Sequence, residues 1–240
     1  MCMSTFCALP FGWHGWDEEA RPIMTLFLPF VGTFIGALWT AFALLLRHFE
    51  IPSPVFAAAL CAFPFLITGG IHMDGFLDVT DALKSWRDMA ERRKILKDPH
   101  VGSFAVLHGI LLILAQFSLF WSLKPEAEYL TLLLIAVTSR SMAALCVTIL
   151  RPISTSEYSG TYRRGIKSSH MILLLGILSV TIASGFLFLG KYGFASLAVI
   201  AGYLIQARRA IRSLGGMSGD VSGYAMTFAE LCGIAVFALI

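Results

Sequence analysis

Three aspartates come directly after an apolar stretch and share one face of an expected helix. Asp74, Asp78 and Asp81 are spaced i, i+4 and i+7. A helix advances about 100° per residue, so these carboxylates point to one side. Like charges held together repel one another unless a cation neutralises them, and Mg²⁺ commonly takes one or two carboxylates plus substrate phosphates. The spacing therefore predicts a magnesium site that acts on a phosphorylated substrate at the edge of a membrane.

A second polar segment follows the aspartates and could bind phosphate oxygens. Lys97 precedes Gly102 and Ser103, which begin the next apolar stretch. A helix N-terminus offers free N–H groups and a favourable dipole to anions. The alternative is that Asp98 and Ser103 are ordinary helix caps.

Two glycine pairs each precede an aspartate. Gly69 and Gly70 precede Asp74, and Gly215 and Gly216 precede Asp220. Glycines allow sharp turns and close approach of the backbone to a phosphate or a metal-bound group. A flexible hairpin explains the second pair equally well.

Arg140 lies in the middle of an apolar stretch. A guanidinium at the centre of a membrane helix costs about 2.5–3.5 kcal/mol on the mildest scale, so it requires a partner. Glu230, in the last apolar stretch, is the available acid. An Arg140–Glu230 ion pair and a contact between Arg140 and an anionic ligand both remain open.

The composition places the chain among membrane proteins. Its mean hydropathy is +0.77, with 57% hydrophobic and 14% charged residues, whereas soluble domains carry about 25% charge. The net charge of +3 is too small to indicate a nucleic-acid partner. The five cysteines lack the spacing of a zinc or redox site and are interpreted as apolar fillers.

Apolar stretches of about 20 residues predict an all-α integral membrane protein, a single domain over residues 1–240 with six to seven transmembrane helices. The candidate spans lie near 24–46, 52–71, 101–123, 129–150, 171–189, 192–206 and 223–240, and the polar loops are 72–100, 151–170 and 207–222. Within the first loop, residues 78–96 predict an amphipathic helix.

The cations are distributed unequally between the two sides of these spans. One side carries only Arg47, Lys124 and Lys191. The other side carries fourteen cations, which are Arg21, Lys84, Arg87, Arg92, Arg93, Lys94, Lys97, Arg151, Arg163, Arg164, Lys167, Arg208, Arg209 and Arg212. The positive-inside rule therefore predicts that the N-terminus and the three polar loops face the cytoplasm.

Two runs of residues resemble motifs of a known family. The run from Gly69 to Leu83 and the run from Ile95 to Phe104 closely resemble those of the cobalamin synthase family, also called adenosylcobinamide-GDP ribazoletransferase. Ser139-Arg140, the segment 215–220 and Glu230 are similar to its later motifs and occur in the same order. The resemblance covers about residues 6–240.

The resemblance implies a multi-pass enzyme of the bacterial inner membrane that completes the nucleotide loop of adenosylcobalamin, the vitamin B12 coenzyme. Such an enzyme is a phosphotransferase that joins adenosylcobinamide-GDP to α-ribazole, or to α-ribazole 5′-phosphate, and releases GMP with Mg²⁺ required. Besides its substrates, such an enzyme contacts the lipid bilayer. Its oligomeric state stays open, and a homo-oligomer is one possibility.

Carried onto this sequence, the resemblance assigns a role to each candidate residue. Asp74, Asp78 and Asp81 are expected to hold Mg²⁺. Lys97 and Arg140 are expected to neutralise the departing GMP, and Asp98 or Asp220 to orient or deprotonate the attacking hydroxyl. The expected substrate-binding residues are Gly69, Gly70, His72, Gly75, Lys84, His100, Gly102, Ser103, Gly216 and Gly219.

Other classes fit the residues less well. A phosphotransferase of the CDP-alcohol type also has an acidic motif that begins Asp-Gly, but Ala-Arg should follow and a longer spacer should precede the last aspartate. An intramembrane prenyltransferase would need paired Asp-Asp motifs. A non-enzymatic transporter or cation channel would place acids near the middle of the membrane, where only Arg140 and Glu230 lie.

Overall fold

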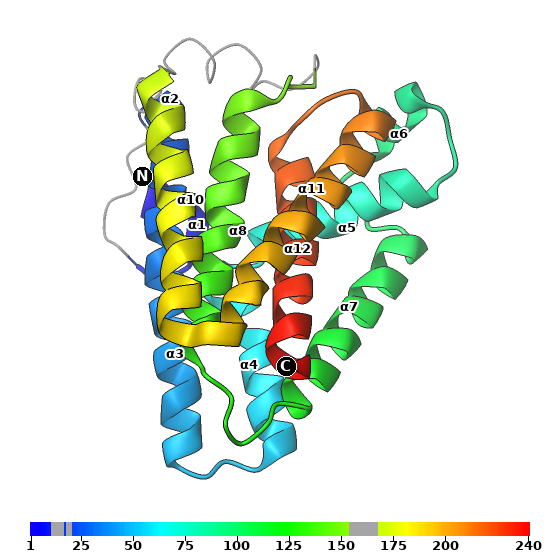
Figure 1. The fold of residues 1–240 in the computed structure, drawn as a ribbon. Coiled ribbons are helices and arrows are strands. Elements are labelled where there is room, and N and C mark those ends of the chain that lie inside the picture. The colour runs from blue at the N-terminus through cyan, green and yellow to red at the C-terminus, as the bar shows by residue number, and fades with distance from the viewer. Residues whose placement is uncertain (11–16, 18–20, 154–167) are drawn as a thin grey trace.

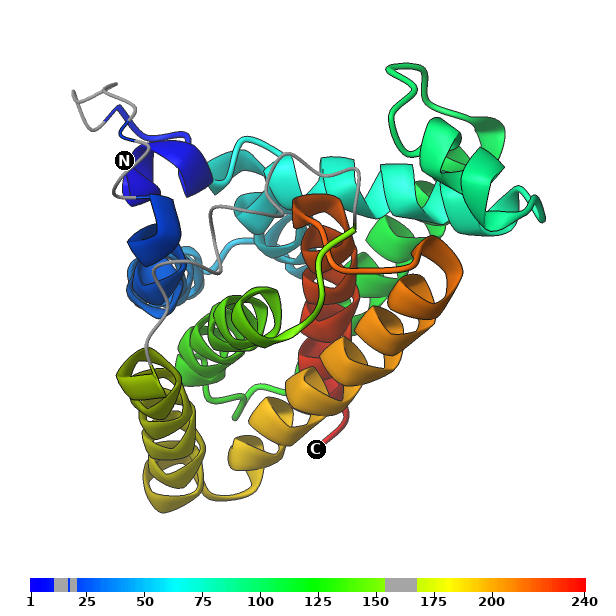
Figure 2. The ribbon, with the colours of Figure 1, turned by 90° about the horizontal axis from the view of Figure 1, so that it is seen from above.

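The computed structural model describes residues 1–10, 17, 21–153 and 168–240, and throughout these the regular elements are helices. Figures 1 and 2 show long helices packed side by side, with one helix lying across the others. Within these ranges, the only pairing of the strand type is an isolated bridge between Pro152 and Met217. The predicted all-α membrane fold is confirmed.

The described residues form the following elements in chain order. They are α1 (Cys2–Phe6), α2 (Arg21–Met24), the 3₁₀ turn η1 (Thr25–Phe27), α3 (Leu28–His48), α4 (Ser53–Ile67), α5 (Ile71–Lys84), α6 (Met89–Ile95), α7 (Ser103–Trp121), α8 (Leu130–Ile149), α10 (Ser168–Leu189), the 3₁₀ turn η3 (Gly190–Gly193), α11 (Phe194–Leu214) and α12 (Gly219–Leu239).

Five stretches of the described chain are long and apolar enough to cross a membrane, or six if the bent pair α4 and α5 forms one span. They are Thr25–His48, Ser103–Trp121, Leu130–Ile149, Ser168–Leu214 and Gly219–Leu239. The fourth consists of α10 and α11, which run in opposite directions in Figure 1. A helix therefore occupies each of the seven predicted apolar segments.

The polar segment 72–100 differs from its prediction. Instead of one amphipathic helix over 78–96, α5 begins at Ile71 and ends at Lys84, and α6 begins only at Met89. Between them Trp86 has a φ of 56°, which ends the helical path. Asp88 then caps α6 by accepting the Glu91 N–H at 3.0 Å.

The loop predicted at 207–222 is shorter in the structure, because the two flanking helices extend into this range. α11 continues to Leu214 and ends at Gly215, whose φ of 84° is left-handed. α12 begins at Gly219, where the Ser218 hydroxyl accepts the Val221 N–H at 3.1 Å. In the loop predicted at 151–170, residues 154–167 lie outside the described part of the chain.

Helix α8 is the centre of the bundle. Its membrane stretch is 83% buried, against 28% for α7 at the periphery. α3 packs closely on α8 because Gly32 and Gly36 lack side chains: a Cβ on Gly32 would lie 2.6 Å from the Ala136 carbonyl oxygen. Small residues at such contacts let membrane helices approach each other closely. In a lipid bilayer the hydrophobic effect does not drive helices together, so close packing contributes much of the association energy.

The feature that positions the site is a 91° bend between α4 and α5. Gly69 and Gly70 make this turn with φ values of 62° and 78°, a conformation that residues with a Cβ rarely adopt. The bend directs α5 across the bundle, where it packs against the first half of α12 (Figure 2). The aspartates of α5 are therefore held against a distant part of the chain.

Candidate active site

A pocket of about 460 Å³ opens where α5 crosses the start of α12. It lies toward the end of the bundle at which α8 finishes, the upper end in Figure 1. Its polar wall includes Thr5, His72, Asp74, Lys97, Ser218, Asp220 and Ser222. Leu28, Ala143, Val147, Ile153 and Met226 are among the apolar residues that line it.

Close packing of α5 on α12 brings Asp220 to the same wall as Asp74. A Cβ on Gly75 would lie 2.9 Å from both the Cα and the carbonyl oxygen of Asp220, so only glycine fits there. One turn further along α12, a Cβ on Gly223 would lie 3.3 Å from the His72 carbonyl oxygen. The Thr227 hydroxyl donates to that carbonyl at 3.1 Å. Gly75 thus supports the site by permitting contact between helices.

Asp78 experiences the negative charges of three further carboxylates, those of Asp74, Asp220 and Asp81. Asp81 lies against Gly102, in the loop that precedes α7. A Cβ on Gly102 would collide with the Asp81 carboxylate, so Gly102 provides the space that this carboxylate occupies. The structure therefore extends the predicted stripe of three aspartates to a group of four.

This acidic group fits a magnesium ion that shares its coordination with a substrate. Among the described residues, no three His, Cys, Asp or Glu side chains are close enough to hold a metal by themselves. Mg²⁺ usually keeps several waters and takes only one or two carboxylates together with phosphate oxygens. Asp74 and Asp220 on the pocket wall match that donor set, and Asp78 and Asp81 add negative charge nearby.

Lys97 lines the pocket as expected, whereas Asp98, His100, Gly102 and Ser103 are not among the residues that line it. Asp98 and His100 form an exposed pair: the His100 N–H donates to the Asp98 Oδ1 at 3.0 Å and the ring Nδ1 lies 2.7 Å from that oxygen. These contacts, the backbone one foremost, hold the pKa of Asp98 below its usual range. Neither residue lines the pocket. Gly102, rather than Asp98 or Ser103, is the N-cap of α7.

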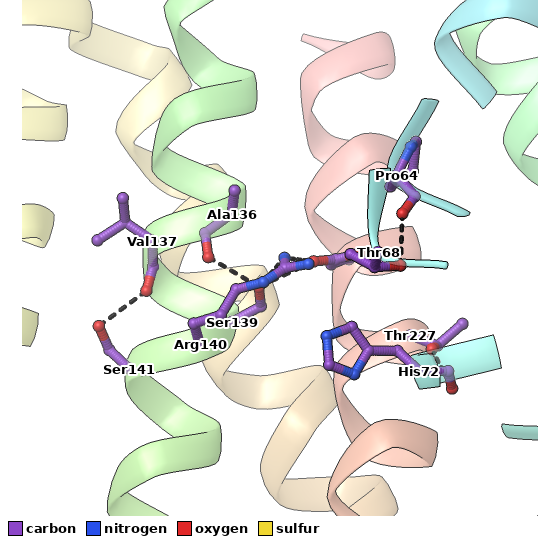
Figure 3. A network of polar contacts seen from close by, with 10 residues as sticks. Pro64, Thr68, His72, Ala136, Val137, Ser139, Arg140, Ser141 and Thr227 are labelled. Carbon is purple, nitrogen blue, oxygen red and sulfur yellow. Dashed lines mark hydrogen bonds and ion pairs between the residues drawn. The ribbon is translucent and has the colours of Figure 1, made fainter. Parts of the chain in front are cut away.

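Arg140 forms a buried ion pair with Glu230. The guanidinium Nη1 donates to Glu230 Oε1, and the Ser139 hydroxyl donates to the same oxygen at 2.9 Å. Figure 3 shows the Arg140 side chain reaching from α8 across the bundle interior, with the His72 ring pointing toward it. Arg140 itself does not line the pocket. Of the two interpretations left open by the sequence, the structure shows the ion pair.

The other candidate binding residues fall into two groups. Gly219 lines the pocket, and a Cβ there would meet nothing within 4 Å. Gly69, Gly70, Lys84, Ser103 and Gly216 are not among the residues that line it. Gly216 instead lets the chain pass close to Pro152 and Ile153, since a Cβ there would lie 2.5 Å from the Ile153 nitrogen.

Several residues of the pocket were missed in the sequence. Thr5 and Phe6 come from the short helix α1, and the Phe6 ring stacks on His72 with centroids 6.1 Å apart. A five-residue helix leaves too short a pattern to detect. Ser218 was detectable, because a serine just before an apolar run is a typical N-cap.

Fold and pocket together define a polytopic helical membrane protein with an acidic pocket at one end of its bundle. The sequence model of one family, described as cobalamin-5-phosphate synthase, matches residues 1–238. The chain belongs to the cobalamin-5-phosphate synthase family.

Similar proteins that match over most of their own length support this assignment. A protein of Clostridium perfringens (strain SM101) is 33% identical over 242 residues, covering 100% of this chain and 96% of its own. A protein of Clostridium botulinum (strain Alaska E43) is 31% identical over 98% of this chain and 94% of its own. One of Desulfitobacterium hafniense (strain Y51) is 32% identical over 85% of this chain and 82% of its own. All three are named adenosylcobinamide-GDP ribazoletransferase. No solved structure matches the chain significantly.

Proposed function

We propose that this chain joins adenosylcobinamide-GDP to α-ribazole, or to its 5′-phosphate, and releases GMP. The family and the names of full-length relatives support this activity. The observation that carries the proposal is that one pocket is lined by Asp74, Asp220 and Lys97. The two aspartates come from α5 and α12, which are far apart in the sequence. Carboxylates and a cation together suit a substrate diphosphate bound with a divalent metal ion.

The proposed reaction is a transfer at phosphorus. The ribazole 5′-oxygen forms a bond to the phosphorus on the cobinamide side, the bond to the bridging oxygen breaks, and GMP departs with the electron pair. A bound Mg²⁺ supplies charge neutralisation on the diphosphate oxygens. Asp74 would hold that ion together with substrate phosphate oxygens, while Asp78 and Asp81, which do not line the pocket, would add to the negative potential. Lys97 would neutralise the departing phosphate.

The hydroxyl proton requires an acceptor near the attacking oxygen. Of the two acids considered, Asp220 lines the pocket, whereas Asp98 is exposed and paired with His100. The position on the wall favours Asp220 as the group that orients or accepts this proton. Arg140 does not contact the substrate in this proposal. Its ion pair with Glu230 instead holds α8 and α12 in position behind His72.

The side of the membrane on which the pocket opens is also a proposal. Lys97, Arg208, Arg209 and Arg212 lie in or near the segments at the pocket end, and the positive-inside rule places such segments in the cytoplasm. A nucleotide-activated substrate would reach the pocket from that compartment. We therefore infer an inner-membrane enzyme whose pocket faces the cytoplasm.

The test is release of GMP by the purified full-length chain in lipid nanodiscs supplied with adenosylcobinamide-GDP, α-ribazole and Mg²⁺. We expect equal amounts of GMP and cobalamin, and loss of turnover when chelator removes the metal. Asp74→Asn should lower the turnover rate by at least about 10²-fold, as expected when a charge-stabilising group is lost. The matched control is Asp88→Asn, since Asn caps α6 as well as Asp does.

Two results would contradict the proposal. A folded chain that releases no GMP from this substrate pair is not the proposed transferase. Substrate flux into sealed vesicles without GMP release would identify a transporter instead. Full activity of Asp74→Asn at ordinary Mg²⁺ would remove Asp74 from the metal site but leave the reaction itself standing.

A further inference from the structure

A second pocket, of about 320 Å³, lies at the opposite end of the bundle from the acidic one. It forms where α3 and α7 end and α4 and α8 begin, the lower end in Figure 1. Its lining combines charged and aromatic residues: Arg47, Glu50, Ile51, Ser53, Phe56, Phe120, Trp121, Leu123 and Tyr129. Nothing in the proposed transfer reaction uses this pocket.

One wall presents a cation on a rigid support. The Arg47 Nη1 donates to the Tyr129 hydroxyl at 3.3 Å, and Tyr129 is only 6% exposed. The rings of Phe56 and Phe237 hold the Tyr129 ring in T-shaped contacts, with centroids 5.9 Å and 6.2 Å away. Arg47 is exposed, so its remaining N–H groups are available to an anion, and a guanidinium pairs well with phosphate oxygens.

The pocket is also lined by an anion, Glu50, whose backbone has an unusual conformation. After α3 the Ile51 N–H bonds the Leu46 carbonyl at 3.1 Å and the Glu50 N–H bonds the Arg47 carbonyl at 3.0 Å, the pattern of a Schellman motif. Glu50 occupies the left-handed position of that motif, with a φ of 51°, where glycine is usual. Its side chain forms no ion pair or hydrogen bond with any residue in the described ranges.

We propose that this pocket binds the headgroup of an aminophospholipid such as phosphatidylethanolamine. Its phosphate would pair with Arg47 and its ammonium group with Glu50. Trp121, which is 54% exposed at the end of α7, lies at the level where aromatic residues anchor membrane proteins in the headgroup layer. One cation and one anion in the same pocket match a headgroup that carries both charges.

The test is native mass spectrometry of the full-length chain in mild detergent, titrated separately with phosphatidylethanolamine, phosphatidylglycerol, phosphatidylcholine and soluble phosphoethanolamine. We expect phosphatidylethanolamine to be retained most strongly. Arg47→Gln should weaken retention of phosphatidylethanolamine and phosphatidylglycerol, each by about tenfold, the effect of one charged hydrogen bond. Glu50→Gly should weaken only phosphatidylethanolamine, by a similar factor.

Glu50→Gly should not impair folding, because glycine readily adopts the left-handed backbone conformation of Glu50. The melting temperature should therefore stay equal or rise, so weaker lipid retention would not result from unfolding. Glu126→Gln is the matched control, since it removes an exposed charge at the same end outside the pocket. Equal or stronger retention of phosphatidylglycerol by the unaltered chain would overturn the proposal. So would unchanged phosphatidylethanolamine retention in Glu50→Gly, or equal binding of phosphoethanolamine, which has no acyl chains.

Discussion

At the scale of single residues, the most demanding group is the guanidinium of Arg140 in the bundle interior. It is 1% exposed and its partner Glu230 is 7% exposed. Within the described chain, the Nε and Nη2 atoms of Arg140 contact no hydrogen-bond acceptor. A buried charge that is only partly satisfied depends strongly on its one counter-ion. The pair therefore fixes the relative position of α8 and α12, both of which line the acidic pocket.

Glu230→Gln should destabilise the protein although it keeps the shape of the side chain. It leaves Arg140 charged and uncompensated, and breaking a buried pair in this way costs about 3 kcal/mol or more. The measurement is the free energy of unfolding from a denaturant titration in detergent micelles.

The double variant, with Gln at both Arg140 and Glu230, is the control for this prediction. It removes both charges and keeps hydrogen-bonding groups, so most of the lost stability should return. Unchanged stability in Glu230→Gln would mean that the ion pair does not hold the helices together. Arg140 would then be available for a ligand instead.

At the scale of elements, the decisive arrangement is α5 lying across the bundle against α12. The turn at Gly69 and Gly70 sets its direction, and the missing side chains of Gly75 and Gly223 set how closely it approaches. Because the helices touch at these points, Asp74 and Asp220 reach one pocket. The acidic site is thus a product of helix packing as much as of acidic residues.

Gly75→Ala should separate the two helices. The added methyl group would lie 2.9 Å from two backbone atoms of Asp220, which cannot rotate away as a side chain could. We expect a loss of about 1–3 kcal/mol in the free energy of unfolding, the usual range for overpacking. The rate of GMP release should also fall, because Asp74 and Asp220 move apart.

Gly176→Ala is the matched control for this prediction. Gly176 lies inside α10, where an added Cβ would meet nothing within 4 Å. The same substitution there should leave activity unchanged and stabilise the protein slightly, by up to about 1 kcal/mol, through helix propensity. Equal behaviour of the two variants would show that the contact of Gly75 with Asp220 does not matter.

At the scale of the whole molecule, the two ends of the bundle differ in chemistry. Among the described residues, one end carries the acidic pocket and most of the cations, and the other carries the smaller pocket with Arg47 and Glu50. In the family activity proposed here, soluble nucleotide substrates enter at the first end. The second end then meets only lipid and the opposite aqueous face.

Thiol labelling tests this orientation in a variant whose five cysteines are replaced. Trp86→Cys, at a position that is 86% exposed between α5 and α6, should react with a membrane-impermeant maleimide only in inside-out vesicles. Glu126→Cys, at the other end, should react only in intact cells. The reverse pattern would place the acidic pocket outside the cytoplasm.

The sequence by itself determined the properties that depend on neighbours along the chain. Hydropathy over about 20 residues identified the membrane helices, because each such helix satisfies its own backbone hydrogen bonds. The helical period placed Asp74, Asp78 and Asp81 on one face, and the structure keeps all three in α5. The partner of Arg140 was one of two alternatives, because few ionisable groups lie deep enough to pair with it.

Only the tertiary structure decided which distant segments meet. The approach of Asp220 to Asp74 follows from the 91° bend before α5 and from a helix contact that requires glycine. The positions of Phe6 beside His72 and of Arg47 beside Tyr129 in the second pocket also depend on packing between elements. Such contacts leave no periodic pattern in the chain, since they are fixed by how side chains fill space between helices.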